Sequence, residues 1–280
     1  MMSDAASLIA FSGDHLDAAT RLSQQARWPH RREDWQMALA LSQGCVAITG
    51  DGRVIGTVLM TPYGSSAGTI NMVIVDEAER GRGLGRRLMQ QAMTLAGDRR
   101  LQLVATEDGL PLYEKLGFRR TSEIVQHQGQ LAVAVARPQG VRAAAADEIT
   151  AIAALDAAAF GAVRSDLIAH VASLGAFALL ERGDRMAGFA ALRRFGRGLV
   201  IGPVVAADLD DAKALITYFL AGRQAEFIRV DTGIETGLAP WLGGLGLGHA
   251  GGGIVMHRPA ANDSTRRCPT SFALASQAFG

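Results

Sequence analysis

The chain has 280 residues and a formal charge of +1, because 28 Lys and Arg side chains nearly balance 27 Asp and Glu side chains. This balance argues against a nucleic-acid-binding protein, which usually shows a clear basic excess. No apolar run approaches the roughly 20 residues of a membrane span, and the first residues lack the pattern of a signal peptide. The two cysteines are too few for a disulfide scaffold, so we expect a soluble, cytoplasmic protein without a membrane or nucleic-acid partner.

The first half of the chain has the mixed pattern of an α/β domain. Apolar residues at helical or alternating spacing predict its elements, and Asp51-Gly52 is typical of a hairpin turn. In chain order we expect helices over 14–24 and from 34 onward, strands over 45–49, 54–61 and 69–75, a helix over 86–95, a strand over 101–105, a short helix over 112–116 and a last strand over 131–135. A linker with Pro and Gly at 137–140 ends this half.

The second half repeats this order, which indicates a tandem duplication. We expect helices over 146–158, 165–174 and 211–221, and strands over 176–181, 186–193, 199–205, 227–231 and 254–257. The segment 242–247 aligns with 113–118 at an offset of 129 residues. These observations predict one domain over 1–138, a second over 139–260, and a C-terminal tail, 261–280, that docks on the fold.

The strongest local signal is a glycine-rich turn, Arg80-Gly81-Arg82-Gly83-Leu84-Gly85, between a predicted strand and a predicted helix. Glycines let the backbone turn tightly and leave its N–H groups accessible, and a helix N-terminus favours an anion. This arrangement is typical of a phosphate or pyrophosphate site, although a flexible basic turn has the same composition. It lacks the Gly-Lys-Ser/Thr of a Walker loop and the third glycine of a dinucleotide fingerprint.

The turn resembles the Arg/Gln-x-x-Gly-x-Gly/Ala signature of the GNAT superfamily of acetyl-CoA-dependent N-acetyltransferases. Residues 112–118 (LYEKLGF) resemble the second signature of that family. The resemblance covers roughly residues 14–135, and the second half is similar to the degenerate second copy of tandem members. It implies a mixed α/β fold of two tandem domains, each with a central mixed, mostly antiparallel sheet flanked by helices.

The resemblance also implies an acetyl transfer from acetyl-CoA to a primary amine, by direct attack in a ternary complex. The cosubstrate would be held by Val73, Ile74, Val75, Arg80, Gly81, Arg82, Gly83, Leu84, Gly85 and Arg86. Tyr113 would protonate the departing thiolate of CoA, unless it is simply a buried helix aromatic. Glu77 replaces a proline that is common in the family, and Thr106 replaces an asparagine, so the CoA contact of that amide is not carried over.

The sequence offers several candidates for the general base and the acceptor site. The strand 69–73 contains no titratable side chain, so we predict His30 or Glu107 as the base, with Asp108 as a further candidate. The predicted acceptor pocket consists of Trp28, His30, Arg31, Trp35, Tyr63 and Asp108. The structural alternatives are a Trp-Pro stack against the core and a solvated loop histidine. No metal is expected, since the six histidines show no ligand spacing.

The second half lacks the chemical groups of the first. At the offset of 129, alanines and acidic residues at 209–214 replace the glycine-rich turn, and Leu242 replaces Tyr113. We therefore expect that the second copy does not bind CoA in this way and instead closes one wall of the acceptor cleft. There Arg193, Arg194 and Arg197 either reach an anionic substrate or lie on a solvated hairpin.

The sequence thus predicts an N-acetyltransferase that acts on a small-molecule amine rather than a protein and works as a monomer or homodimer. Two alternatives stay open: transfer of another acyl group from its CoA thioester, and a non-catalytic acyl-CoA sensor whose second domain signals occupancy to a partner. A large loss of turnover in Tyr113→Phe, with unchanged CoA affinity, would support catalysis over the sensor.

Overall fold

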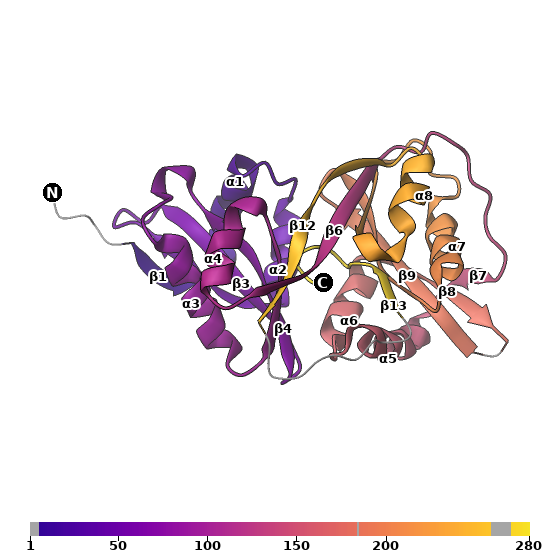
Figure 1. Ribbon diagram of the computed structural model, residues 1–280, viewed down its shortest axis with the longest axis horizontal. Helices are drawn as coiled ribbons and strands as arrows, with labels where there is room; N and C mark the ends of the chain where they lie inside the picture. The colour runs from indigo at the N-terminus through magenta and orange to yellow at the C-terminus, as the bar shows by residue number, and fades with distance from the viewer. Residues whose placement is uncertain (1–5, 184, 259–269) are drawn as a thin grey trace.

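The computed structural model describes residues 6–183, 185–258 and 270–280. Two α/β lobes lie side by side, the first built mainly from the N-terminal half of the chain and the second mainly from the C-terminal half (Figure 1). The strands of the first half are β1 (Ser7–Ala10), β2 (Gln43–Ile48), β3 (Val54–Tyr63), β4 (Ala67–Val75), β5 (Arg100–Ala105) and β6 (Arg119–Gly129). Its helices are α1 (Leu16–Gln25), α2 (Arg32–Ala40), α3 (Leu84–Ala96) and α4 (Leu110–Lys115).

The second half contributes the remaining elements. Its strands are β7 (Val141–Ala143), β8 (Gly175–Arg182), β9 (Arg185–Phe195), β10 (Gly198–Ala206), β11 (Ile228–Gly233), β12 (Gly248–Arg258) and β13 (Thr270–Ala273). Its helices are α5 (Ile149–Phe160), α6 (Ser165–Leu174), α7 (Leu209–Leu220) and α8 (Leu238–Gly244). Among all these described helices, none is long and apolar enough to cross a membrane.

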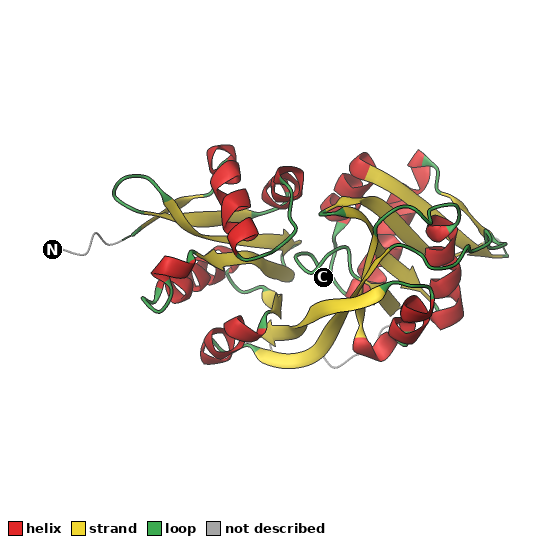
Figure 2. Ribbon diagram, turned by 90° about the horizontal axis from the view of Figure 1, so that it is seen from above, coloured by secondary structure: helices red, strands yellow, loops and turns green. Residues whose placement is uncertain are grey.

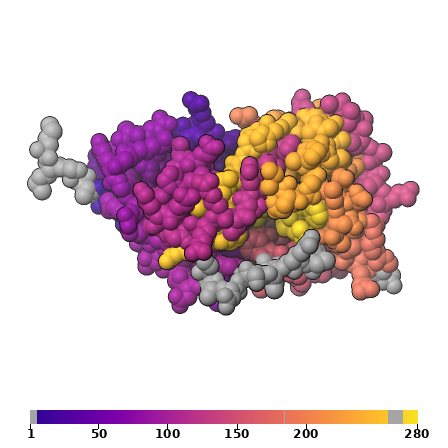
Figure 3. Space-filling view, in the orientation of Figure 1, coloured from indigo at the N-terminus to yellow at the C-terminus, as the bar shows by residue number. Residues whose placement is uncertain are grey.

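A single mixed sheet runs through both lobes in the order β1-β2-β3-β4-β5-β12-β6-β11-β10-β9-β8-β7, with β13 paired to β10. In its middle, β12 from near the end of the chain lies between β5 and β6, and β6 also pairs with β11. The yellow atoms of β12 accordingly lie against the magenta surface of the first half (Figure 3). The expected mixed, mostly antiparallel sheet flanked by helices is confirmed. Because the sheet is continuous, strand pairing does not mark the predicted domain boundaries at 138 and 260.

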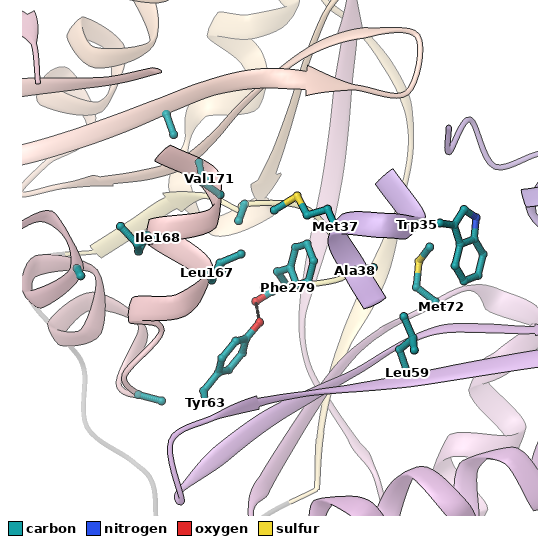
Figure 4. Packing of buried hydrophobic residues seen from close by; sticks show 14 of the residues in the cluster. Trp35, Met37, Ala38, Leu59, Tyr63, Met72, Leu167, Ile168, Val171 and Phe279 are labelled. Atoms are coloured by element: carbon teal, nitrogen blue, oxygen red, sulfur yellow. Dashed lines mark hydrogen bonds between the residues drawn. The ribbon is translucent and has the colours of Figure 1, made fainter. Parts of the chain in front are cut away.

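Helices cover both faces of the sheet (Figure 2). On one face, helices of both lobes pack into a shared core that includes Trp35 and Met37 of α2, Leu167 and Ile168 of α6, and Phe279 near the C-terminus (Figure 4). On the other face, α3 and α4 cover the first lobe, and α7 and α8 cover the second. The shared core holds the two lobes together where their facing surfaces form a cavity.

Our prediction of a last strand over 131–135 is wrong. The last strand of the first half is β6, at 119–129. Leu131 is buried in the core of the second lobe, while Val133 is 47% exposed and the backbone N–H of Ala132 donates to the Leu245 carbonyl. The apolar pattern of 131–135 therefore reflects one buried side chain in an irregular segment. β6 is polar along much of its length because its side chains face a cavity or solvent, and its partners are the distant β11 and β12.

β4 separates from its neighbour β5 soon after the two strands begin. Their parallel pairing involves residues 67–69 and 100–102, and beyond these positions none of the described strands pairs with β4 on that side. A bulge at Met72 and Val73, with Met72 at φ +53°, places two β4 residues opposite one residue of β3. The C-terminal part of β4 therefore presents backbone groups to a gap in the sheet.

Candidate active site

The glycine-rich turn leads into α3 with a backbone suited to an anion. Gly81 and Gly83 both have φ +77°, which side-chain-bearing residues rarely adopt. A Cβ added at either glycine would have no atom within 4 Å, so the turn is open and needs glycine for its backbone conformation rather than for space. Gly83 is the N-cap residue of α3, and no side chain caps that helix end. The first-turn N–H groups of α3 are thus available to a ligand.

The charges around the turn are divided between paired and unpaired arginines. Arg82 pairs with Glu79 at 2.9 Å, and Arg53 pairs with both Glu79 and Asp76. Arg80 and Arg86 are exposed, and neither forms an ion pair with any residue that the structure describes. Asp76 and Glu79 are therefore paired, whereas Glu77 forms no ion pair with the described residues. Two guanidinium groups beside the open helix end also keep their charge.

A cavity of about 840 Å³, which we name the loop cavity, extends from this turn to the gap beside β4. Nine of the ten predicted cosubstrate residues line it, and the exception is Arg82. Its lining residues from that set are Val73, Ile74, Val75, Arg80, Gly81, Gly83, Leu84, Gly85 and Arg86. The structure therefore brings together residues that the sequence analysis assigned to one ligand.

Tyr113 of α4 lines the loop cavity as well. The side chain is 8% exposed, and its ring lies edge-on to Phe118 and against Gly109, where a Cβ would come within 2.7 Å of the ring. Burial raises the pKa of the Tyr113 hydroxyl to about 12. No residue in the described part of the chain hydrogen-bonds to this hydroxyl, so at neutral pH it is a protonated donor that faces the cavity.

A second cavity, of about 370 Å³, lies where the two lobes meet, and we name it the junction cavity. Its walls come from the 27–30 loop and β4 of the first lobe, from β6 and β12, and from the 195–197 turn and residues 276–278 of the second half. Arg27, Trp28 and Thr106 line both cavities. The two spaces therefore adjoin, and a molecule in one can approach a molecule in the other near Trp28.

His30 is one of the predicted site residues that do line the junction cavity, together with Trp28. Its ring packs against Trp28, Trp35 and Phe195, and its Nδ1 has no hydrogen-bond partner among the described residues. Burial lowers the pKa of His30 to about 4, and the nearby charge of Arg229 acts in the same direction. The imidazole is therefore neutral at neutral pH and is a weak base.

Four other predicted acceptor residues lie elsewhere. Arg31 pairs with Asp34 at 2.8 Å, and Trp35 is fully buried with its Nε1 donating to Ser23. Tyr63 donates to the Phe279 carbonyl at 2.7 Å (Figure 4) and borders a separate cavity of about 610 Å³. Asp108 borders the loop cavity instead of the junction cavity. The predicted base Glu107 is exposed and is not among the residues that line either cavity.

Several residues of the junction cavity are absent from the predicted acceptor set. They include Asn71, Gln126, Gln128, Arg229 and Ser276. Arg197, which we expected either at an anionic substrate or on a solvated hairpin, also lines this cavity. Of its two neighbours, Arg193 is buried and donates to the Ala275 carbonyl, while Arg194 is exposed. Among these cavity residues, only Arg197 was singled out from the sequence, as one of three nearby arginines in the second half.

The second lobe has no equivalent of the loop cavity's turn. Residues 76–83 separate β4 from α3, but only residues 207 and 208 separate β10 from α7. Ala212 and Ala214 lie inside α7, as the helix predicted over 211–221 implies, so our alignment of them with glycines of a turn is wrong. Asp208 caps this helix by accepting from the Asp211 N–H at 2.9 Å. β13 pairs with β10 beyond the point where β10 leaves β11, so the corresponding gap is filled.

The described part of the chain shows no cluster typical of a metal site. Among residues 6–183, 185–258 and 270–280, no cluster of three or more His, Cys, Asp or Glu side chains has the arrangement of metal ligands. The two cavities offer anion-binding backbone, a buried phenol, arginine side chains and uncharged polar groups.

Comparisons with known proteins agree with this geometry. Acetyltransferase (GNAT) domain families match residues 41–120 and residues 152–267. An uncharacterized N-acetyltransferase, YitH, from Bacillus subtilis (strain 168) is 28% identical over 233 residues, which cover 80% of this chain and 81% of that protein.

Two solved structures share the fold over nearly the whole chain. A putative acetyltransferase from Pyrococcus horikoshii has a TM-score of 0.82 at 16% identity and covers 100% of this chain and 98% of its own. A tandem GNAT protein from the clavulanic acid biosynthesis pathway has a TM-score of 0.64 at 16% identity, covering 92% of this chain and 100% of its own. From these matches and from the two lobes described above, the chain belongs to the GNAT acetyltransferase family as a tandem member.

Proposed function

We propose that the protein transfers an acetyl group from acetyl-CoA to the primary amine of a small molecule, by direct attack in a ternary complex. The observation that carries this proposal is the meeting of the two cavities at Arg27, Trp28 and Thr106. One cavity contains an open helix end and a protonated phenol, and the other is lined by polar side chains. Two molecules bound side by side can react directly, without a covalent enzyme intermediate.

The loop cavity fits the diphosphate of CoA. The positive-φ glycines at 81 and 83 and the uncapped end of α3 direct backbone N–H groups into an open turn, and Arg80 and Arg86 add unpaired positive charge. The bulge at Met72 and Val73 removes one residue from the strand ladder, and this supports a role for β4 backbone N–H groups in binding the acyl carbonyl. Acetyl-CoA, when bound, supplies the activated thioester.

Tyr113 and His30 have different roles in this proposal. Tyr113 keeps its proton at neutral pH and can donate it to the thiolate that leaves, which is the role of a general acid. His30 accepts a proton poorly because its pKa is about 4. We therefore expect the amine to lose its proton to solvent, and kcat/KM to rise with pH up to the pKa of the free amine, with no inflection between pH 6 and 7.

The test is an assay of CoA release from acetyl-CoA in the presence of a panel of small amines, followed by mass spectrometry of the product. The expected result is an amine-dependent release of CoA and an N-acetylated product that gains the mass of one acetyl group. Binding of acetyl-CoA without turnover of any amine would refute the transferase and support the sensor alternative. Calorimetry that detected no binding of acetyl-CoA or CoA would refute both.

A further inference from the structure

The junction cavity has a strongly one-sided charge. Three of its lining residues are the arginines Arg27, Arg197 and Arg229, and no Asp or Glu is among the described residues that line it. Arg27 also borders the loop cavity, so its charge can serve either ligand. Arg197 and Arg229 border the junction cavity and not the loop cavity, and both come from the second half of the chain. The second lobe thus contributes a positively charged wall to the junction cavity, which residues of the first lobe also line.

Arg229 is held rigidly on β11 with one side still available. Its Nε and Nη2 donate to the fully buried Asp231 at 2.8 to 3.1 Å, and its guanidinium lies 5.0 Å from the centre of the Phe195 ring. Nη1 has no acceptor among the residues that the structure describes. Because the planar guanidinium is fixed by two bonds on one edge, it can bind an anion through the other edge with little loss of side-chain entropy.

Carboxylates balance only part of the positive charge of the arginines in and around the junction cavity. The arginines in and around the cavity are Arg27, Arg31, Arg193, Arg197 and Arg229, and the two carboxylates that face them are Asp34 and Asp231. Arg197 has no acidic partner in the described part of the chain. Burial, together with the charges of Arg31 and Arg229, lowers the pKa of Arg193 to about 10 against the opposing charge of Asp34. This site is therefore electropositive before any ligand binds.

The cavity also contains buried polar atoms without a partner. Asn71 and Ser276 are 6% and 2% exposed, and the Oδ1 of Asn71 and the Oγ of Ser276 have no hydrogen-bond partner among the described residues. Such an atom costs about 1–3 kcal/mol when it stays unsatisfied, so a ligand with polar groups is favoured there. The Asn71 amide is oriented because its Nδ2 donates to Thr61 at 2.9 Å, which leaves an acceptor for an N–H group.

The unpartnered polar atom of Asn71 and the arginine side chains face different parts of the proposed acceptor. Asn71 is on β4 directly before the bulge at Met72 and Val73, and Val73 lines the loop cavity. Arg197 and Arg229 are on the opposite lobe. An acceptor that spans the cavity therefore presents its amine beside Asn71, near the acyl group, and its other end to the arginines.

We propose that the acceptor is a polar amine that also carries an anionic group, a carboxylate or a phosphate, bound by Arg197 and Arg229 while Asn71 accepts from its amine. This inference rests on the proposed acetyl transfer, and it adds the chemical class of the substrate. It also gives the second lobe a role, because that lobe binds the acceptor without binding a cosubstrate of its own.

The test compares amines in matched pairs that differ only in the anion. One pair is glucosamine and glucosamine 6-phosphate, and the other is alaninamide and alanine, so the two arms separate phosphate from carboxylate. In at least one pair we expect the anionic member to have a kcat/KM at least 10-fold higher, and a correspondingly lower Kd by calorimetry in the presence of CoA. If the neutral member is as good in both pairs by both measurements, the proposal is wrong.

Variants then locate the anion. Arg197→Gln should reduce the anionic-to-neutral ratio about 10-fold, and Arg197→Lys should restore part of it, because a cation on the same stem keeps the attraction. Arg194→Gln is the matched control, since Arg194 is an exposed arginine near the end of β9, just before the turn that carries Arg197, and does not line the cavity. An unchanged ratio in Arg197→Gln overturns the assignment. If anion-selective binding is found but no acetyl transfer, the proposed function fails, while the anion site at Arg197 and Arg229 stands.

Discussion

His30 gives the sharpest quantitative prediction, because burial moves its pKa from 6.5 to about 4. Between these two pH values the unfolded chain binds a proton at this imidazole and the folded protein does not. Folded stability must therefore fall as the pH drops through this window, and the shift of about 2.5 units corresponds to about 3 kcal/mol. Above pH 6.5 both states are neutral at this site, and stability there is independent of it.

The perturbation is His30→Gln, which removes the titrating group and keeps a polar side chain. Chemical denaturation at pH 7.5 and pH 4.5 should show that the wild type loses roughly 2–3 kcal/mol more than the variant on acidification. Comparing losses rather than absolute stabilities removes any packing cost of the substitution. Equal losses in the wild type and His30→Gln would show that the folded protein protonates His30 as readily as the unfolded chain does. Our inference that the amine loses its proton to solvent, and not to His30, would then be wrong.

Three further predictions concern the loop cavity and the core. Tyr113→Phe should lower kcat about 100-fold or more at an unchanged Kd for CoA by calorimetry, and an unchanged kcat would exclude it as the acid. Gly83→Ala should weaken CoA binding and cost on the order of 1–2 kcal/mol of stability, because Gly83 is in the left-handed helical region. Gly97→Ala, at the far end of α3, should cost more stability, because its φ of +59° and ψ of −132° lie outside that region, but it should leave the Kd unchanged. Arg164→Met should destabilise the protein by about 3–5 kcal/mol in denaturant melts, because it leaves the fully buried Asp156 unpaired. The double variant with Asp156→Leu should recover part of that loss.

The features that could be predicted from the sequence are those encoded by neighbouring residues. The turn at 80–85 and helix α3 are recognisable because strand, glycines and helix follow one another within a short segment. For the same reason most helices and strands lie within a few residues of their predicted bounds, and α6 lies at its predicted residues. The loop cavity is built almost entirely from such a local segment, so its lining residues were largely predictable.

The junction cavity could not be predicted in this way, because its walls come from segments more than a hundred residues apart. Asn71, Arg229 and Ser276 have ordinary neighbours in the sequence, and they meet only because β6 and β12 join the lobes and the tail returns to them. Conversely, Trp35 was predicted in the acceptor pocket because it lies in the region of the first two helices, where the fold that the sequence resembles usually meets its substrate. Tyr63 was predicted either to line that pocket or simply to end a hairpin strand. Packing instead places both in the shared core, where their polar atoms bond to Ser23 and Phe279.

The two gaps in the sheet explain how a degenerate copy can still serve the site. In the first lobe, no described strand pairs with β4 beyond residue 69 on the side of β5, and this leaves room for a ligand. In the second lobe, β13 fills the same place: it pairs with β10, the Leu274 N–H donates to the Asp231 carbonyl, and Thr232 donates to the Phe272 carbonyl. The chain then continues directly into residues 276–278, which line the junction cavity. Filling the second gap thus anchors the segment that lines the junction cavity, next to the same Asp231 that orients Arg229. In the proposed reaction, the second copy therefore contributes to acceptor binding although its own gap offers no room for a cosubstrate.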